Sequence, residues 1–538
     1  MPHVTTETRG ATAPHSRRRQ TVVGVAVGLL TAGAALGAAG LAAGVLGTAS
    51  PVVVVGDALV DNSPSALMEL AISILGTADK PVLLAGIVVV LAVSGAVLGI
   101  GALRRPVLGH LGLAILATAG AAAVLLRRAD DPGAVVPVLV GAVSGALVLV
   151  LLLRSAHRYL RSGEEGKTTA RAAARREAPE TARAPGRRGF VLTATGVLGA
   201  SAAAGVVGHW LPRALGGASA GSALTLPEPA TAPPPLPAGV DLGVPGLTPF
   251  TTPNADFYRI DTALTVPRPD PSRWTLRIHG MVDRPFEVDL DELLALPLEE
   301  ADITLACVSN QVGGDLVGNT RWLGAPLAAL LRRAGVHSGA DQILSTSSDG
   351  WTCGTPTEVV MDGRDALLAV GMGGEPLPAE HGYPARMVVP GLYGFVSATK
   401  WITEIKLTRF ADERAYWARR GWGVRAPVKT MSRVDVPAPL GRVASGDVVL
   451  AGVAWAQHRG VAAVEVRVDG GTWREAELAR VPGVDTWVQW VAETSVAPGP
   501  HDVEVRATDA TGATQPSARA EPIPDGATGW HRIRFTAE

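Results

Sequence analysis

Five long apolar stretches, separated by stretches that carry charged residues, dominate the first 211 residues of the chain. They cover residues 21–49, 81–103, 106–126, 133–153 and 190–211, and none of them contains Asp, Glu, Lys or Arg. Each is long enough for a membrane-spanning helix, which needs about 20 mostly apolar residues. Their charged flanks and uncharged interiors favour membrane spans over buried core helices. We therefore predict a cytoplasmic tail at 1–20 and an α-helical membrane region with five transmembrane helices at 21–211.

The pattern changes after residue 240 to short strands and helices. In residues 241–430, strand-like stretches such as "WTLRIHGMV" and "WITEIKLTR" occur with the helical stretch "APLAALLRRAG", which predicts an α+β domain. In residues 431–538, stretches such as "AAVEVRVDGGTW" alternate apolar and polar residues and end in turn residues. This pattern predicts a small β-sandwich of the immunoglobulin type. Residues 212–240 are too rich in Pro to pack and should form an extended linker.

Charge predicts the orientation of the spans. Lys and Arg gather before the first span, at Arg104 and Arg105 between the second and third, and at residues 154–189, which hold ten Lys or Arg and four Asp or Glu. Such clusters mark the cytoplasmic side of a membrane. The loop at 50–80 is acidic, as expected for an outside loop. With five spans, everything after residue 211 should lie outside the cytoplasm. The formal net charge of −1 argues against a nucleic-acid partner.

The fifth span begins with a pair of arginines, in "GRRGFVLTATGVLGASAAAG". Arg187, Arg188 and Phe190 resemble a twin-arginine export signal placed inside the chain. The alternative is an ordinary pair of flanking arginines beside a membrane helix. The twin-arginine route moves folded proteins, so a downstream domain that takes up a cofactor in the cytoplasm would need it. The "ASA" at 218–220 suits either a signal-peptidase site or plain linker.

One of the two cysteines, Cys307, stands at the end of a predicted strand and before a Gly-rich loop, in "TLACVSNQVGGDLVGNTRW". Site residues often lie where a strand gives way to a loop. A buried, inert thiol is one alternative. A disulfide with Cys353 is another, because the predicted compartment is oxidising.

The motifs around this cysteine resemble those of the molybdenum enzymes of the sulfite oxidase type, which include the periplasmic sulfoxide reductases. The resemblance covers roughly residues 249–535 and is carried by "CVSN", "RWLGAPLAALL", "HGYPARMVVPG", the "KW" at Lys400 and Trp401, and "AWAQHRGVAAVEVRVDGG". It implies a catalytic domain that binds one molybdenum–molybdopterin cofactor, followed by a sandwich that serves for dimerisation. Cys307 matches the protein thiolate that binds the metal, and a soft thiolate suits molybdenum.

The resemblance also implies a set of site residues. For the cofactor, these are Asn254, Tyr258, Arg259, Cys307, His381, Arg386, Ser397 and Lys400; for catalysis, Cys307, Arg259 and Arg459. Cations suit the phosphate at the end of the pterin. Two departures concern the substrate: Gln311 and Val312 replace arginines of sulfite-oxidising members, and Cys353 replaces a tyrosine beside the metal. A pocket with fewer arginines should hold sulfite less well.

The implied activity is transfer of an oxygen atom to or from a small sulfur or nitrogen oxo compound, coupled to two electrons, and the sequence leaves the direction open. The chain contains no C-x-x-C-H haem motif. We therefore expect a separate electron carrier, in the membrane or outside the cytoplasm. The alternatives of another class are a catalytically inactive, membrane-tethered binding or sensor module and a transporter. Transport is disfavoured because the spans lack internal charged residues.

Overall fold

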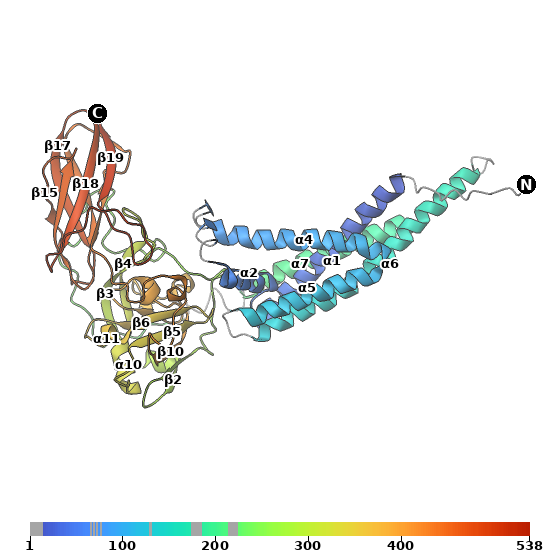
Figure 1. Cartoon of the computed structure of the whole chain (residues 1–538), viewed down its shortest axis with the longest axis horizontal. Helices are drawn as coiled ribbons and strands as arrows, with labels where there is room; N and C mark the ends of the chain where they lie inside the picture. Colours follow the sequence, from blue (N-terminus) through green and yellow to red (C-terminus); the bar gives the residue numbers. More distant parts are fainter. Residues whose placement is uncertain are drawn as a thin grey trace, which may run out of the picture. The chain divides into compact units, whose positions relative to one another are not determined.

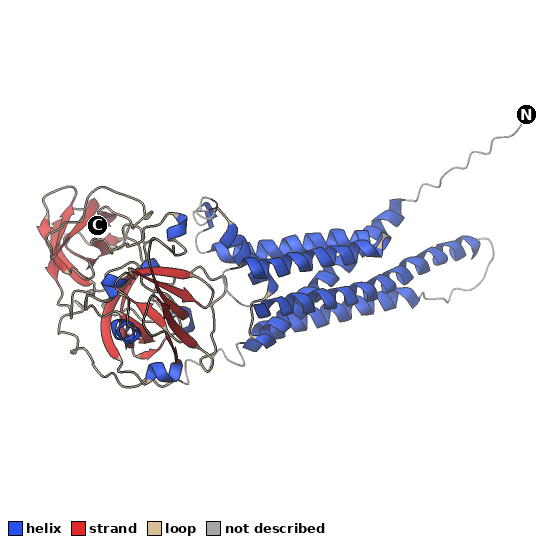
Figure 2. Ribbon diagram, turned by 60° about the horizontal axis from the view of Figure 1, so that its bottom comes forward, coloured by secondary structure: helices blue, strands red, loops and turns tan. Residues whose placement is uncertain are grey.

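The computed structural model describes residues 14–538 except 65–66, 68–69, 72–73, 76–77, 128–131, 174–184 and 213–223. The chain divides into two compact units, residues 1–217 and residues 218–538. Helices make up the described part of the first unit, and strands predominate in the second (Figures 1 and 2). The small-residue site suggested at 218–220 lies outside the described residues.

The first unit contains the helices α1 (Pro14–Leu46), α2 (Pro51–Asn62), α4 (Asp79–Arg104), α5 (Pro106–Leu126), α6 (Val135–Ala173) and α7 (Pro185–Pro212), with the short turn η2 (Pro132–Ala134) before α6. Five of them, all but α2, contain a stretch long and apolar enough to cross a membrane. This confirms the five predicted helices by length and composition. Helix α2 was not predicted, although Pro51 at its first turn is typical of a helix start.

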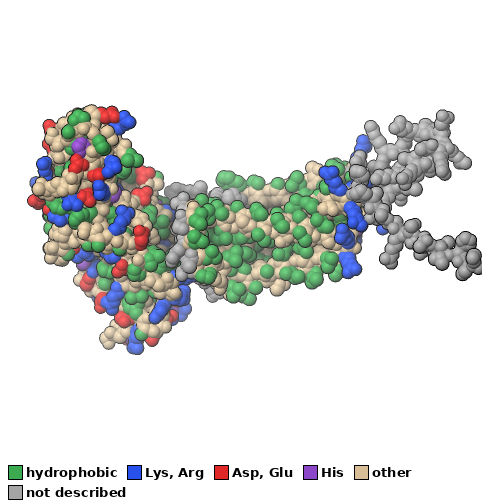
Figure 3. Space-filling view, turned by 45° about the horizontal axis from the view of Figure 1, so that its top comes forward, with side chains coloured by type: hydrophobic (Ala, Val, Ile, Leu, Met, Phe, Trp, Pro, Cys, Tyr) green, Lys and Arg blue, Asp and Glu red, His purple; other side chains and the backbone are tan. Residues whose placement is uncertain are grey.

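The outer surface of these helices is apolar. Large side chains such as Val89 and Leu192 are 60% and 72% exposed, respectively. Figure 3 shows apolar side chains along the bundle and a group of Lys and Arg at one of its ends. Contacts join three of these helices: the guanidinium of Arg19 in α1 lies over the ring of Tyr159 in α6, and the ring of His157 in α6 hydrogen-bonds the carbonyl of Leu103 in α4. A surface of this kind suits lipid better than water.

Glycines bring the backbone of α1 against its neighbours. A Cβ added at Gly28 would lie 1.9 Å from the carbonyl oxygen of Gly95 in α4, and one added at Gly208 of α7 would lie 2.5 Å from the backbone of Gly40. Such close approach is typical of membrane helix packing.

At the end of α5, Arg127 pairs with Asp57 of α2 at 3.6 Å. The acidic loop therefore neutralises part of the positive charge at that end.

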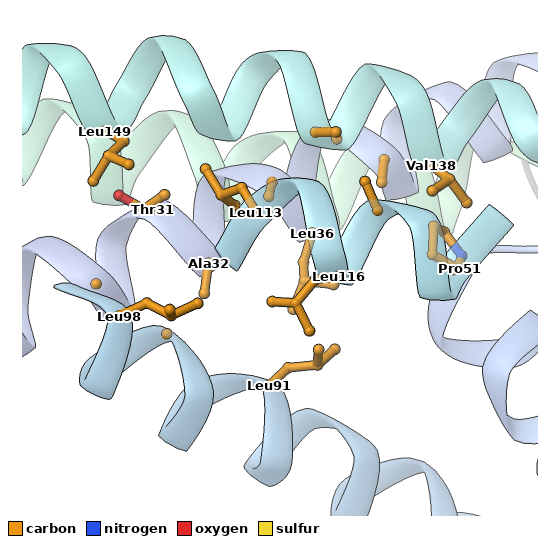
Figure 4. Close-up of a pocket in the computed structure, with 18 of the residues that line it drawn as sticks. Thr31, Ala32, Leu36, Pro51, Leu91, Leu98, Leu113, Leu116, Val138 and Leu149 are labelled. Carbon is orange, nitrogen blue, oxygen red and sulfur yellow. The ribbon is translucent and has the colours of Figure 1, made fainter. Parts of the chain in front are cut away.

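An apolar cavity lies between α1, α2, α4, α5 and α6 (Figure 4). Leucines such as Leu98, Leu116 and Leu149 and small residues such as Ala32 line it. The one hydroxyl in its wall, that of Thr31, donates to the carbonyl of Val27 at 2.8 Å. The lining therefore presents almost no free polar group to this space.

Two sheets, one mixed and one antiparallel, form the first part of the second unit. One has the strand order β2 (Phe286–Asp289), β1 (Thr275–Gly280), β10 (Ile402–Thr408), β5 (Gln342–Ser347), β6 (Thr352–Pro356). The other has the order β3 (Glu299–Ala306), β4 (Val317–Pro326), β7 (Leu367–Met372), β8 (Glu375–Pro376), and β9 (Arg386–Val388) also pairs with β7. Short helices connect them: α9 (Leu290–Leu294), α10 (Leu327–Ala334), α11 (Thr357–Val360), η4 (Ala379–His381), η5 (Gly394–Val396) and η6 (Ala418–Arg420).

Helix α10 shows how these elements form the core. Leu327, Leu330 and Leu331 are spaced three and four residues apart, so they share one face, and all three are buried. Gly335 ends the helix with φ of +73°, a left-handed conformation that glycine adopts without strain. The face packs into a core that both sheets share. The predicted mixture of strands and a helix is present here.

The last part of the unit consists of two sheets that pack over a common apolar core around Trp490 and Phe535. One sheet has the order β11 (Met431–Val436), β13 (Gly446–Trp455), β17 (Val488–Val496), β16 (Glu477–Leu478); the other has β12 (Arg442–Val443), β19 (His531–Ala537), β18 (Gly499–Asp509), β14 (Val461–Val468), β15 (Arg474–Glu475). We refer to residues 431–538 as the C-terminal sandwich. Its assignment to the immunoglobulin type stays a prediction, as do the domain boundaries.

Residues 224–240 are extended, as predicted, but they pack against the rest of the second unit. The amide of Ala230 donates to the carbonyl of Leu298 at 2.7 Å, and the amide of Glu300 donates to Thr231 at 3.0 Å. Leu224 and Leu226 contact the core. The expectation that this segment is too rich in Pro to pack is therefore wrong, because an extended Pro-rich backbone can still pair with an open strand edge.

Candidate active site

Cys307 begins a loop, residues 307–316, that joins β3 to β4. The amide of Cys307 donates to the carbonyl of Leu316 at 2.9 Å, and the amide of Leu316 donates to the side-chain oxygen of Asn310 at 3.0 Å. The Sγ of Cys307 accepts a hydrogen bond from the amide of Ser309 at 3.4 Å. Cys307 and Cys353 are both free thiols, which excludes the disulfide alternative.

The thiol of Cys307 faces a pocket in the second unit. The empty space in this pocket, counted together with the open solvent at its mouth, is about 800 Å³. Its walls are formed by Phe257, Tyr258, Ile260, Asp261, Thr262, Cys307, Ser347, Asp349, Trp351, His381, Arg386, Gly394, Phe395, Ala398, Lys400, Trp401 and Trp417. The fold therefore brings together five of the predicted residues, Tyr258, Cys307, His381, Arg386 and Lys400.

Arg386 supplies a buried positive charge to this pocket. It is 6% exposed, and its guanidinium donates to the carbonyls of His381 and Ala398 at 3.1 and 3.5 Å and lies 5.0 Å from the ring centre of Trp322. Burial lowers its pKa to about 10, so it stays charged at neutral pH. Within the part of the chain that the structure describes, no carboxylate pairs with it. A buried cation in this state is suited to an anionic ligand.

Lys400 and His381 line the same pocket as Arg386. The Nζ of Lys400 donates to Asp261 at 2.8 Å and to the carbonyl of Glu380 at 3.2 Å. Burial lowers the pKa of Lys400 to about 8, against the opposing effect of Asp261. Burial, and then the charges of Arg386 and Lys400, lower the pKa of His381 to about 4, so this ring is neutral at pH 7. Its Nε2 lies 3.1 Å from the backbone oxygen of Asn254 and donates to it.

Burial also raises the pKa of the Cys307 thiol, while the hydrogen bonds from Ser309 and the charge of Lys400 lower it by less. The pKa of Tyr258 is raised as well, first by burial and then by Cys307. A buried thiol in this setting is protonated until a metal replaces the proton.

Four predicted residues do not line the pocket. Ser397 is fully buried and donates to the carbonyls of Leu392 and Tyr393, and the side-chain amide of Asn254 donates to Met372. Arg259 is exposed and pairs with Asp261 at 2.9 Å. Arg459 pairs with Asp509 at 2.9 Å and donates to Val428 and Thr430. Asn254 and Arg259 still adjoin the pocket through His381 and Asp261.

The sequence did not predict the aromatic wall or the turn between β5 and β6. The wall consists of Trp351, Phe395, Trp401 and Trp417. In the turn, the Oγ of Ser347 and the Nε1 of Trp351 are buried and make no hydrogen bond within the described residues. Two unpaired polar groups in the wall of a pocket are expected to bond a ligand, because burying them unpaired is costly. In the sequence, the turn "SSDGW" is the signal that could have pointed to these two residues.

The chain is similar to known molybdenum enzymes in this region. Residues 263–417 match the family of the oxidoreductase molybdopterin binding domain. The chain is 32% identical over 156 residues to the uncharacterized oxidoreductase YuiH of Bacillus subtilis (strain 168), covering 29% of this chain and 75% of that protein. It is 30% identical over 272 residues to the mitochondrial sulfite oxidase of Rattus norvegicus, covering 43% of this chain and 49% of the relative. It thus spans about half the length of that oxidase.

Among solved structures, the sulfane dehydrogenase SoxCD from Paracoccus pantotrophus matches with a TM-score of 0.48 and 22% identity, over 54% of this chain and 84% of that one. The unpaired donors, the buried cation and the single thiol described above fit a cofactor that combines a phosphate, a polar ring system and a thiophilic metal. The chain belongs to the sulfite oxidase-type family of molybdopterin-dependent oxidoreductases, and its cofactor is molybdenum–molybdopterin.

Proposed function

We propose that this chain is a membrane-anchored oxidoreductase that transfers an oxygen atom to or from a small sulfur or nitrogen oxo compound outside the cytoplasm. The observation that carries the proposal is the meeting of Cys307 with the buried cations Arg386 and Lys400 in one pocket. When bound, the molybdenum cofactor supplies two-electron redox chemistry coupled to oxygen-atom transfer. Sulfoxide reduction takes up two electrons and two protons and releases the sulfide and water. Sulfite oxidation takes up water and releases sulfate, two electrons and two protons.

The residues of the pocket have distinct roles in this proposal. Cys307 is the metal ligand, and Arg386 and Lys400 bind the cofactor's anionic end. Neutral His381, held by Asn254, offers its second ring nitrogen as an acceptor, and Tyr258 closes the same side. Ser347 and Trp351 supply the two unpaired polar groups. Ser397 orders the backbone next to the pocket, because both of its hydrogen bonds go to the chain just before it.

For the substrate, the mouth of the pocket favours a neutral or singly charged S- or N-oxide over sulfite. Its aromatic wall is largely apolar, and Arg259, which adjoins the pocket through Asp261, is already paired with that carboxylate. Gln311 contacts Glu521 and does not line the pocket. Each missing charge-assisted contact costs about 1.5–3 kcal/mol, or roughly tenfold to a hundredfold in affinity. Arg459 would act on substrate only if it left Asp509.

The two electrons require a partner, because the chain contains no C-x-x-C-H haem motif. We propose a separate electron carrier in or outside the membrane. The five apolar helices support membrane anchoring, and the Lys and Arg at one end of the bundle support placing that end in the cytoplasm. A homodimer through the C-terminal sandwich remains part of the proposal.

A direct test is molybdenum and pterin analysis of the full chain purified in detergent from a host that makes the cofactor. We expect about one molybdenum per chain. Cys307→Ser should keep the fold, because serine is similar in size, yet abolish turnover. Cys353→Ala, outside the pocket wall, is the matched control and should keep most activity. Full turnover in the Cys307→Ser variant would contradict the assignment of the metal ligand.

Steady-state rates test the substrate. We expect methionine sulfoxide, reduced with an artificial donor, to turn over at least as well as sulfite oxidised with an artificial acceptor. The sulfite reaction should need a high concentration, and Arg259→Gln should weaken it further. Tight, fast sulfite oxidation that survives Arg259→Gln would overturn this view of the pocket.

A further inference from the structure

The segment that carries Cys307 is held by the C-terminal sandwich, beginning three residues before the thiol. The amide of Thr304 donates to the carbonyl of Asp485 at 2.9 Å, and its hydroxyl accepts from the amide of Trp487 at 2.8 Å. Its carbonyl accepts from the side-chain amide of Gln457 at 3.2 Å. Three hydrogen bonds to one residue fix the end of β3 against the sandwich.

A second contact holds the far side of the loop. Arg433 of β11 is largely buried, and its guanidinium donates to the carbonyl of Gly314 at 2.7 Å, to the hydroxyl of Thr248 at 2.9 Å and to Asp435 at 2.6 Å. The planar fork of an arginine can satisfy three acceptors at once, which a lysine cannot. Arg433 therefore links the cysteine loop (residues 307–316) both to the segment at Thr248 and to the sandwich.

The loop itself lies directly on the sandwich. Gly313 has φ of +79°, and a Cβ at this position would lie 2.2 Å from the ring of His531 in β19. Next to it, the side-chain amide of Gln311 donates to Glu521 at 3.2 Å. No side chain fits between the loop and His531 at this point, so glycine allows the close approach.

The position of the loop sets the position of the sulfur. The amide of Ser309 donates to the Sγ of Cys307, and the amide of Cys307 donates to Leu316 across the loop. A metal–ligand bond tolerates errors of about 0.2 Å. A loop with two adjacent glycines, Gly313 and Gly314, has little stiffness of its own to keep that tolerance.

We propose that the C-terminal sandwich positions the Cys307 thiolate for molybdenum, and that Arg433 is the positioning residue. This inference rests on the proposed role of Cys307 as the metal ligand. The sandwich then acts on the site of its own chain, in addition to any part it takes in dimerisation.

Hydrogen–deuterium exchange of the full chain in detergent tests the first half of this inference. The amides of Cys307, Asn310, Gly314 and Leu316 are all hydrogen-bonded, so their exchange reports local opening of the loop. In Arg433→Gln we expect exchange across 307–316 to rise about tenfold to a hundredfold. Exchange in the β5–β6 hairpin should stay unchanged.

Arg433→Lys is the second variant, because it keeps the charge next to Asp435 but cannot reach all three acceptors. It should also loosen the loop. Arg506→Gln is the matched control: Arg506 is a half-buried arginine of the same sandwich that pairs with Glu465 at 2.8 Å and makes no contact with the loop among the described residues. Uniform faster exchange in both Arg433 variants, or no change in the loop, would overturn the inference.

X-ray absorption at the molybdenum edge of the loaded protein tests the second half. We expect the average number of sulfur ligands to fall in the Arg433 variants and to stay unchanged in Arg506→Gln. A loose loop with full sulfur coordination would overturn the positioning role. If wild type and Cys307→Ser give the same sulfur coordination, the proposed metal ligand is wrong, whereas the exchange result would still stand.

Discussion

At the scale of single residues, Arg386 carries a charge that nothing in the described chain neutralises with a carboxylate. Burying such a charge is costly unless a counter-ion arrives. Arg386→Met should therefore affect two forms of the protein differently. The melting temperature of the cofactor-free chain should change little or rise, because the burial cost is removed, whereas cofactor retention should fall at least tenfold. Differential scanning calorimetry and pterin analysis measure the two effects.

Arg364→Met is the control for this prediction. Arg364 is also largely buried, but it pairs with Asp362 at 2.6 Å and donates to the carbonyl of Pro390. Its loss should lower the melting temperature of both forms and leave the retained cofactor unchanged. A large loss of stability in cofactor-free Arg386→Met would show that this charge is compensated within the chain.

His531, beneath the cysteine loop, makes stability depend on pH. Burial, and then Arg433, lower its pKa to about 4, with Asp435 opposing and Arg519 adding to the shift. The unfolded chain takes up this proton near pH 6.5, before the folded chain does. The stability that neutral His531 contributes is thus present above pH 6.5 and is lost as pH falls toward 4.

Thermal unfolding followed by tryptophan fluorescence measures this loss. Trp210 is the one tryptophan of the chain that precedes the second unit, so the signal reports mainly on that unit. We expect the melting temperature to fall between pH 6.5 and 4, and His531→Gln to make the fall shallower. The same slope in the variant would assign the pH dependence to other groups, such as His381.

At the scale of elements, the segment 224–240 covers the edge of β3 and contacts the core. An open strand edge invites pairing with other chains, so a covering segment protects it. Removing 224–240 would lose two backbone hydrogen bonds and uncover part of the core beneath Leu224 and Leu226. We expect a chain that starts at residue 241 to melt several degrees lower and to aggregate more readily than one that starts at 224. Equal melting temperatures would show that the segment only rests on the surface.

The sequence allowed the prediction of elements whose pattern is local. The period-two stretch at Val464 and Val466 is part of β14, and the stretch predicted to be helical contains α10. The packing of 224–240 could not be read in this way, because it depends on the edge of β3, far along the chain. Ser347 and Trp351 were missed for the same reason: a five-residue turn has no periodicity, and its polar groups gain meaning only next to Cys307 and Arg386.

At the scale of the whole molecule, the apolar helical unit and the β-rich unit that holds the site have different requirements during biosynthesis. In the proposed function, the helices are inserted into a bilayer, whereas the second unit takes up its cofactor before it leaves the compartment where that cofactor is made. Arg187 and Arg188 lie near the start of α7, which is the last helix of the first unit in the sequence. If an export receptor recognises these arginines, export of the second unit can begin after that unit has folded and bound its cofactor. An ordinary insertion signal depends on charge alone.

Replacing both arginines by lysine separates these cases, because charge is kept while the guanidinium pattern is lost. We expect Arg187→Lys with Arg188→Lys to abolish export of the second unit. When protease is added to cells with a permeabilised outer layer, the second unit of this variant should be protected, whereas that of the wild type should be digested. The same change at Arg104 and Arg105, another cluster between spans, should leave export intact. If the Arg187/Arg188 variant still exposes a domain that contains molybdenum, the arginines serve only as flanking charges, and the cofactor must be inserted after the second unit has crossed the membrane.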